Sequence, residues 1–419
     1  MAEEKDGRLG WARPLGLGPT GLLPNLYDVV IFILIAAVFV GLAHGAREMM
    51  APTSRLTLEP VTLDAGNLPE YALRTTLRMF AAIVASLLFT FVVATLAAKS
   101  RKAELVIIPA LDILQSVPVL GFLTFTVVFF LGLFPQSQLG AECAAIFAIF
   151  TAQAWNMAFS FYQSLRTLPS DLDEVSRHFG LSPWLRFWRL EAPFAAPGLI
   201  WNTMMSMSGG WFFVVASEAI TVGDTTVKLP GIGSWLAVAI DAKDLRAVLL
   251  AVGTMAMVIL AYDQLLFRPI VAWADKFRFE QTAAQQRPRS WVYEFWRRGR
   301  VIRRLSAVMA WIGRRLSMMS NPFGRPVRKA APAIVGRIAD FLWLPIVLAV
   351  VAYALWRIVE FVESSLGWSD VTTAFGLGLL TLVRVVVLIA LASLVWVPIG
   401  VWIGLRPWAA NRVQPVAQF

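Results

Sequence analysis

Apolar segments of about 20 residues with few charges dominate this sequence. Such a segment, folded as a helix, crosses the roughly 30 Å hydrocarbon core of a bilayer, where only helices and closed barrels satisfy their backbone polar groups. The predicted spans are 26–45, 75–98, 113–134, 139–162, 196–222, 247–267, 341–359 and 379–405. The sequence therefore predicts an all-α integral membrane protein, a polytopic bundle of about eight transmembrane helices.

Composition agrees with a membrane chain, since 58% of the residues are hydrophobic and 15% are charged, against about 25% charged in soluble domains. The net charge of +10 comes from basic residues between the apolar segments. This placement indicates a cytoplasmic membrane face and not a nucleic-acid-binding surface. Cys143 is the only cysteine, which excludes a disulfide within the chain and a cysteine metal cluster.

Positive residues near span ends predict the orientation, because Lys and Arg are retained in the cytoplasm. They precede the first span and follow the second and fourth, whereas the loop 46–73 is rich in acidic residues. Residues 1–25 carry no secretory signal. We therefore expect a multi-pass protein of the bacterial inner membrane with residues 1–25 and the loop 164–195 in the cytoplasm.

The predicted domains are a first transmembrane domain over 26–275, a basic cytoplasmic linker over 276–340 and a second transmembrane domain that begins at 341 and continues to 419. Within the linker, apolar residues from Trp291 to Met319 recur at helical spacing among arginines. This pattern predicts an amphipathic helix in the plane of the lipid headgroups. A solvated basic linker is the alternative.

A weak internal repeat relates the two transmembrane domains. At one constant offset, identical residues pair without a gap: Leu73 with Leu379, Thr75 with Thr381, Arg78 with Arg384, Leu88 with Leu394 and Pro109 with Pro415. We interpret them as a duplicated unit. Because the second copy is shorter than the first, we expect the gene to continue past Phe419 with a second cytoplasmic motif of the kind described next. The alternative is that another copy of the chain completes the pore.

The strongest local signal is the cytoplasmic segment 170–193 between the fourth and fifth spans. Glu174-Val175-Ser176, then Gly180, Leu190 and Pro193 follow one another at a spacing that resembles the EAA motif of ABC-importer permeases, with Val175 and Ser176 in place of two alanines. Acids in its first turn complement a helix dipole, and a glycine permits a sharp change of direction. A chance arrangement in a transporter loop is the alternative.

The resemblance extends over about 73–275. The stretches ALDILQSVPVLGFLTF, GGWFFVVASEAI and PGIGSWL are similar to the group that imports nitrate, sulfonate, taurine, bicarbonate or similar anions, and the duplicated arrangement resembles the fused permeases of that group. This resemblance implies the type I ABC-importer fold and a coupling role for Glu174, Gly180, Leu190 and Pro193. It also implies separate ABC ATPase subunits as partners, which bind ATP and Mg²⁺, and an external solute-binding protein. We find no phosphate-binding G-x-x-x-x-G-K-[ST] stretch here, so no cofactor and no enzymatic activity are expected in this chain.

Polar residues inside the spans are candidates for the transport pathway. Asp112, Gln115 and Ser116 interrupt the start of the third span, with helix packing and kinking as the alternative. Glu218 lies in the fifth span, where an ionisable group must face a cavity or a partner. It is predicted either to act in the pathway or its gating or to form a structural hydrogen bond to a neighbouring helix.

Two other function classes compete with the ABC permease. A secondary transporter would place ion-coupling groups in broken helices at mid-membrane, and a membrane-embedded enzyme would need paired carboxylates, histidine clusters or an activated nucleophile in its spans. The segment 170–193 argues against the first. We recognise no such catalytic groups in the spans, which argues against the second.

Overall fold

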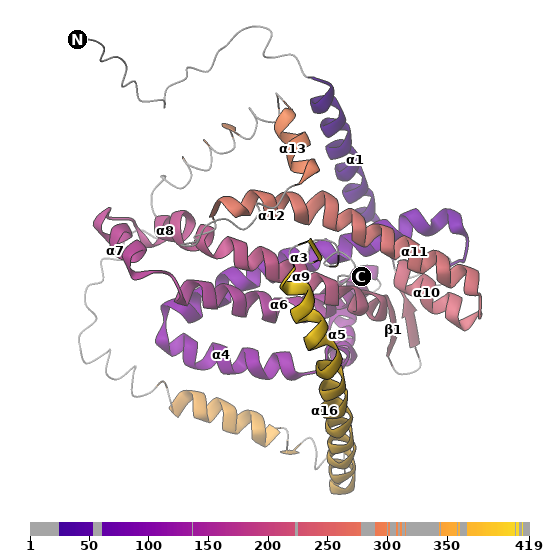
Figure 1. Ribbon diagram of the computed structural model, residues 1–419. Coiled ribbons are helices and arrows are strands. Elements are labelled where there is room, and N and C mark those ends of the chain that lie inside the picture. The colour runs from indigo at the N-terminus through magenta and orange to yellow at the C-terminus, as the bar shows by residue number, and fades with distance from the viewer. Residues whose placement is uncertain are drawn as a thin grey trace, which may run out of the picture. The chain divides into compact units, whose positions relative to one another are not determined.

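The computed structural model describes residues 25–52, 61–135, 137–222, 225–277, 290–299, 301, 307–308, 311, 315, 343, 345–357, 359–360, 367–406, 408–409 and 413. The chain divides into two compact units, Met1–Ser320 and Asn321–Phe419. The first unit carries most of the described structure (Figure 1). Its elements are α1 (Leu26–Met49), η2 (Ala65–Asn67), α3 (Leu68–Lys99), α4 (Arg101–Ser116), α5 (Val119–Leu133), α6 (Gln138–Arg166), α7 (Ser170–His178), α8 (Pro183–Arg186), η3 (Phe187–Glu191), α9 (Ala192–Glu218), β1 (Ala219–Val222), β2 (Thr225–Lys228), α10 (Ile232–Asp241), α11 (Leu245–Tyr262), η4 (Asp263–Phe267), α12 (Arg268–Ala274), η5 (Asp275–Phe277) and α13 (Trp291–Arg298).

Short polar side chains set the starts of several helices by accepting hydrogen bonds from otherwise unpaired backbone N–H groups. Asn25 and Asp28 form a reciprocal capping box at α1. Ser100 accepts from an N–H in the first turn of α4, and Ser137 does the same at α6. Each of these helices therefore begins where its sequence supplies a cap.

The predicted third span, 113–134, is wrong at its start. The structure divides this stretch between α4, which ends at Ser116, and α5, which begins at Val119. Pro118 explains the break, because proline has no N–H to donate and its ring disfavours the helical conformation of the preceding residue. Val117 accordingly has an extended ψ of 128°.

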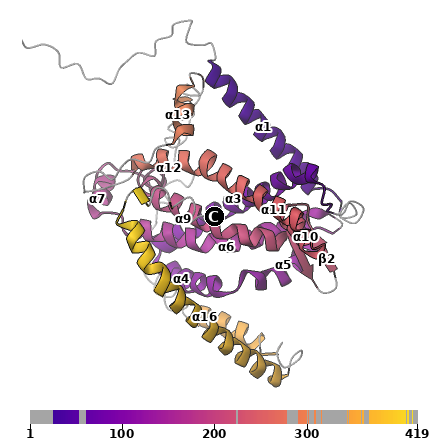
Figure 2. The same cartoon turned by 45° about the vertical axis from the view of Figure 1, so that its right-hand side comes forward.

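The core of the first unit lies among α3, α6 and α9, which run side by side in both views, with α11 against them (Figures 1 and 2). Met79, Ile149 and Met207 are buried at this junction together with Trp211. Tyr262 at the end of α11 packs edge-on against Trp211 and donates a hydrogen bond to the Thr76 carbonyl oxygen, 3.1 Å away. One apolar core thus joins four long helices.

The two ends of this helix group carry different structures. The short helices α7 and α8 lie at one end, whereas the hairpin of β1 and β2 lies at the other with α10 (Figures 1 and 2). The strands pair antiparallel from Ala219–Lys228 to Val222–Thr225. At the base of the hairpin the Leu229 N–H donates to the Glu218 carbonyl, 2.8 Å away. The indole of Trp235, fully buried in α10, donates to the Ala247 carbonyl at 3.0 Å.

The predicted helical membrane class is confirmed, with this hairpin as a small exception. Because residues 219–222 form a strand, the predicted fifth span ends too late. Among the described residues, five helices are long and apolar enough to cross a membrane, so the expected number of eight is not confirmed. They are Leu26–Met49, Ala65–Lys99, Gln138–Arg166, Leu245–Phe277 and Trp368–Gly404.

The basic linker is described mainly at α13, which packs on the first turn of α1. The rings of Tyr27 and Phe295 lie 5.0 Å apart at centroids. The Asn25 side-chain amide donates to the Arg298 carbonyl at 2.9 Å, and the Val301 N–H donates to Asp28 Oδ1 at 3.0 Å. Most of the predicted amphipathic helix beyond α13 lies outside the described residues.

In the second unit, the described structure is a short apolar helix, Pro345–Arg357, and α16 (Trp368–Gly404). α16 contains the predicted span 379–405 almost completely. Its most apolar window has a mean hydropathy of 2.5, and none of that window is buried within the described structure.

Candidate functional site

The segment predicted to couple to an ATPase folds as two short helices joined by a tight reversal at Gly180. Gly180 has a φ of +63°, in the left-handed region that glycine adopts without a Cβ penalty. Its N–H donates to the Arg177 carbonyl and the next N–H, of Leu181, donates to the Ser176 carbonyl. These two bonds form a Schellman motif, so the glycine ends α7 and redirects the chain into α8.

The tip of this segment is exposed and mixes acidic with apolar side chains. Val175 is 51% exposed and Phe179 is 75% exposed, while Glu174 and Gly180 are exposed beside them. Two apolar side chains are thus open to contact at the end of a polar helix.

The four predicted coupling residues do not form one surface. Glu174 and Gly180 lie at the exposed tip, whereas Leu190 and Pro193 are half-buried farther along, in η3 and at the start of α9. The second pair therefore joins the tip to the long helices.

A cluster of ion pairs fixes α7 to the helix group. Arg186 contacts Asp173 of α7 at 2.5 Å and Glu191 at 3.0 Å, and Lys99 at the end of α3 contacts Glu191 at 2.7 Å. Glu191 is only 4% exposed. Arg186 Nε and Glu191 Oε2 lack hydrogen-bond geometry, so the attraction is electrostatic more than directional.

Sequence reasoning did not single out Glu191. The only available signal was an acidic residue directly before an apolar span, inside the matched motif. Its π-helical segment η3 also packs aromatically on α3, since Phe187 lies 6.2 Å from Phe91 and Lys99 lies 5.5 Å from the Phe187 ring centroid.

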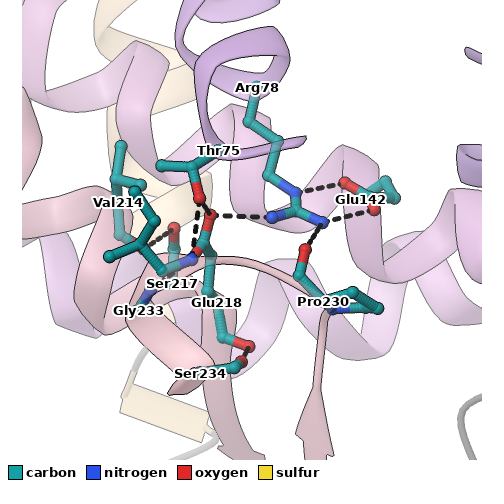
Figure 3. A network of polar contacts seen from close by, with 10 residues as sticks. Thr75, Arg78, Glu142, Val214, Ser217, Glu218, Pro230, Gly233 and Ser234 are labelled. Atoms are coloured by element: carbon teal, nitrogen blue, oxygen red, sulfur yellow. Dashed lines mark hydrogen bonds and ion pairs between the residues drawn. The ribbon is translucent and has the colours of Figure 1, made fainter. Parts of the chain in front are cut away.

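The predicted pathway residues separate into two places. Asp112, Gln115 and Ser116 lie on the exposed last turns of α4, where Gln115 donates to Asp112 at 3.3 Å. Glu218 instead is fully buried at the end of α9, within a network of polar contacts (Figure 3).

Arg78 of α3 is the centre of this buried network. It makes two hydrogen bonds to Glu142 of α6, at 2.5 and 2.7 Å, and one to Glu218 at 2.7 Å (Figure 3). A fourth bond goes to the Pro230 carbonyl at 3.0 Å. Arg78, Glu142 and Glu218 are each 0% exposed. One guanidinium therefore joins three long helices through two carboxylates.

The Glu218 carboxylate also holds the start of α10. It accepts from Thr75 at 2.6 Å and from the Gly233 N–H at 2.6 Å. Two glycines make room for it: a Cβ at Gly231 would lie 2.3 Å from Glu218 Oε2, and one at Gly233 would lie 2.6 Å from the Val215 Cα. The glycines are thus required by close approach.

Glu218 makes the structural hydrogen bonds that were one of its two predicted roles; a gating role stays a prediction. Arg78 entered the sequence analysis only as a repeat identity, and Glu142 was missed. Both are charged residues inside apolar spans, which is the signal that would have found them.

Comparison with known proteins finds similarity to permeases of binding-protein-dependent transport systems. Residues 86–267 match the sequence profile of the family described as "Binding-protein-dependent transport system inner membrane component". The bicarbonate transport system permease protein CmpB of Synechococcus elongatus is 22% identical over 293 residues, 66% of this chain and 98% of that protein. The nitrate import permease protein NrtB of Leptolyngbya laminosa is 27% identical over 158 residues, 38% of this chain and 52% of that protein. A chain of the inward-facing MetNI methionine ABC transporter is 15% identical with a TM-score of 0.38, covering 48% of this chain and 94% of that one.

Proposed function

We propose that this chain, whose residues 86–267 match the family of inner membrane components of binding-protein-dependent transport systems, is the permease of an ABC importer and that α7 and α8 couple it to a separate ATPase. ATP and Mg²⁺ belong to that ATPase. The relatives named for bicarbonate and nitrate favour a small inorganic anion as the transported solute.

The observation that supports the coupling role is the exposed tip of α7, which ion pairs attach to the ends of the long helices. Val175 and Phe179 offer apolar area to a partner, and Glu174 offers a charge at the same place. The Lys99–Glu191–Arg186–Asp173 chain of ion pairs transmits a displacement of α7 to the ends of α3 and α9. A push on the tip therefore moves the helices that form the core.

The charge pattern supports placing the α7 end in the cytoplasm and the hairpin and α10 on the external side. An external solute-binding protein would then meet the hairpin end. Exposed Asp112, Gln115 and Ser116 on α4 are proposed to line the route between this helix group and a second one. Since a carboxylate repels an anion, Asp112 is assigned to hydration of the route and not to direct contact with the solute.

The test compares two substitutions at Gly180 in the full chain, co-expressed with a candidate ABC ATPase from the same organism. Gly180→Val introduces a β-branched residue that disfavours φ near +63°, at a cost of about 1–2 kcal/mol or more. Gly180→Asn is the matched control, because asparagine tolerates this conformation. We expect Gly180→Val to reduce ATPase co-purification and ATP-dependent uptake together, while Gly180→Asn keeps both.

A second pair of variants tests the docking surface without altering the backbone. Phe179→Asp should weaken binding of the ATPase, and Asp171→Asn, a change in the exposed first turn of the same helix, should not. Unchanged binding in both Phe179→Asp and Gly180→Val, or uptake driven by an ion gradient without any ATPase, contradicts the proposal.

A further inference from the structure

The internal repeat places an arginine at matching positions of the two units, Arg78 in the first and Arg384 in the second. The structure shows which contacts Arg78 makes. In α3, Arg78 and Thr75 both bond to Glu218, and Arg78 also bonds to Glu142. Arg384 and Thr381 occupy the matching positions of α16. The two helices end in register, because Lys99 corresponds to Leu405, the residue after the last of α16.

α16 lacks these contacts within the described part of the chain. Arg384 is exposed there without an ion pair, in a helix whose mean hydropathy reaches 2.5. Thr381 donates to the Leu377 carbonyl of its own helix at 3.0 Å, whereas Thr75 donates to a carboxylate. An arginine in the middle of a spanning helix is costly unless a partner compensates its charge.

The chain's own acidic pair does not supply that partner. Glu142 and Glu218 are fully buried and already bonded to Arg78. Gly231 and Gly233 pack so closely against the Glu218 carboxylate that neither position has room for a Cβ atom. A second copy of this chain would have the same two carboxylates occupied in the same way. Carboxylates that compensate the charge of Arg384 would therefore have to be other than Glu142 and Glu218.

We infer that the Thr381–Arg384 face of α16 binds a further transmembrane helical bundle that presents two buried carboxylates in the manner of Glu142 and Glu218. The neighbouring apolar face fits this role: Leu388 and Ile389 of α16 are 65% and 58% exposed, whereas the matching α3 positions, Ala82 and Ile83, are buried. Charge complementarity and apolar burial then act together, as they do around α3. This inference concerns helix pairing and is independent of whether α7 binds an ATPase.

The test begins with a matched pair of variants, Arg384→Leu and Arg78→Leu, in the full chain expressed in its native membrane. If Arg384 pairs with buried acids, removing it leaves those acids uncompensated, and the yield of folded protein falls at least about tenfold, as for Arg78→Leu. If Arg384 faces lipid, leucine is the better residue and the yield rises or stays the same. The two alternatives thus predict opposite changes in the yield of folded protein. A yield of Arg384→Leu at or above that of the wild type overturns the inference.

A photo-crosslinking residue identifies the partner and covers the case in which Arg384→Leu simply fails to fold. Placed at Leu388, one turn from Arg384, it should crosslink to an apolar peptide that contains a carboxylate other than Glu142 or Glu218. Placed at Val386, on the opposite face, it should label lipid. Changing the identified acids to Gln should restore the yield of Arg384→Leu. A crosslink to a segment without an acid, or to the Glu142 or Glu218 region, refutes the inference.

Discussion

Replacing Arg78 by methionine tests whether the buried network holds the first unit together. The guanidinium makes four hydrogen bonds, three of them to carboxylates. Methionine fills most of the volume but leaves Glu142 and Glu218 buried with no counter-charge. Breaking a buried ion pair by removing one partner costs about 3–5 kcal/mol.

At roughly 2–4 °C per kcal/mol for a domain of this size, Arg78→Met should lower the thermal midpoint by roughly 6–20 °C. The measurement is loss of monodisperse protein after heating in detergent, at one fixed heating rate because the unfolding of such a protein is commonly irreversible.

Arg74 supplies a matched control one helical turn away. It pairs with Glu48 at 3.2 Å and Glu70 at 2.8 Å, whose side chains are 26% and 43% exposed. Arg74 is itself buried, but both of its acids reach solvent and can be hydrated when the arginine is removed, so Arg74→Met should have a smaller effect than Arg78→Met.

Neutralising the acids separates the electrostatic cause from lost packing. Arg78→Met combined with Glu142→Gln and Glu218→Gln should recover a large part of the loss, because no uncompensated carboxylate remains. The reasoning is refuted if Arg78→Met is as stable as wild type, or if the triple variant is no more stable than Arg78→Met.

Three further variants test the packing of other parts of the first unit. Gly140→Val should lower the midpoint by several degrees, because a Cβ there would lie 2.8 Å from the Phe130 carbonyl oxygen and a backbone must move. Trp235→Phe removes the bond to the Ala247 carbonyl, which should cost about 1–3 kcal/mol in the same heating assay. Glu191→Ala leaves Lys99 and Arg186 without their shared buried partner, and amide hydrogen exchange in α7 should accelerate while exchange in α10 is unchanged.

Much of the helical architecture could be predicted from the sequence, because the thickness of the hydrocarbon core fixes the length of an apolar span. The predicted spans 75–98 and 139–162 lie within α3 and α6. The division at Val117 and Pro118 was harder, since an apolar run looks continuous whether or not one proline interrupts it. The short hairpin after Glu218 was missed for a related reason: the residues of its first strand continue the apolar run of α9.

The polar contacts were the least predictable part. Arg78 and Glu142 belong to different helices, and only the packing of α3 against α6 brings them together. No spacing rule connects such residues, although each could be recognised as a charge that the membrane interior requires to be paired. Gly180 was easier, because the turn it makes depends on neighbouring residues alone.

In the hairpin that follows α9, the residues just before β1 and just after β2 are held by hydrogen bonds that do not belong to the strand pairing. The Glu218 carbonyl accepts from Leu229 N–H and from the Ser234 hydroxyl, and the Pro230 carbonyl accepts from Arg78. Because these bonds close the connection at the ends of the two strands, lengthening it between them should cost little: each doubling of loop length adds only about 0.6 kcal/mol. An epitope or fluorophore tag inserted between Val222 and Thr225 should therefore leave the helix group intact and report, from outside intact cells, on which side of the membrane this end lies.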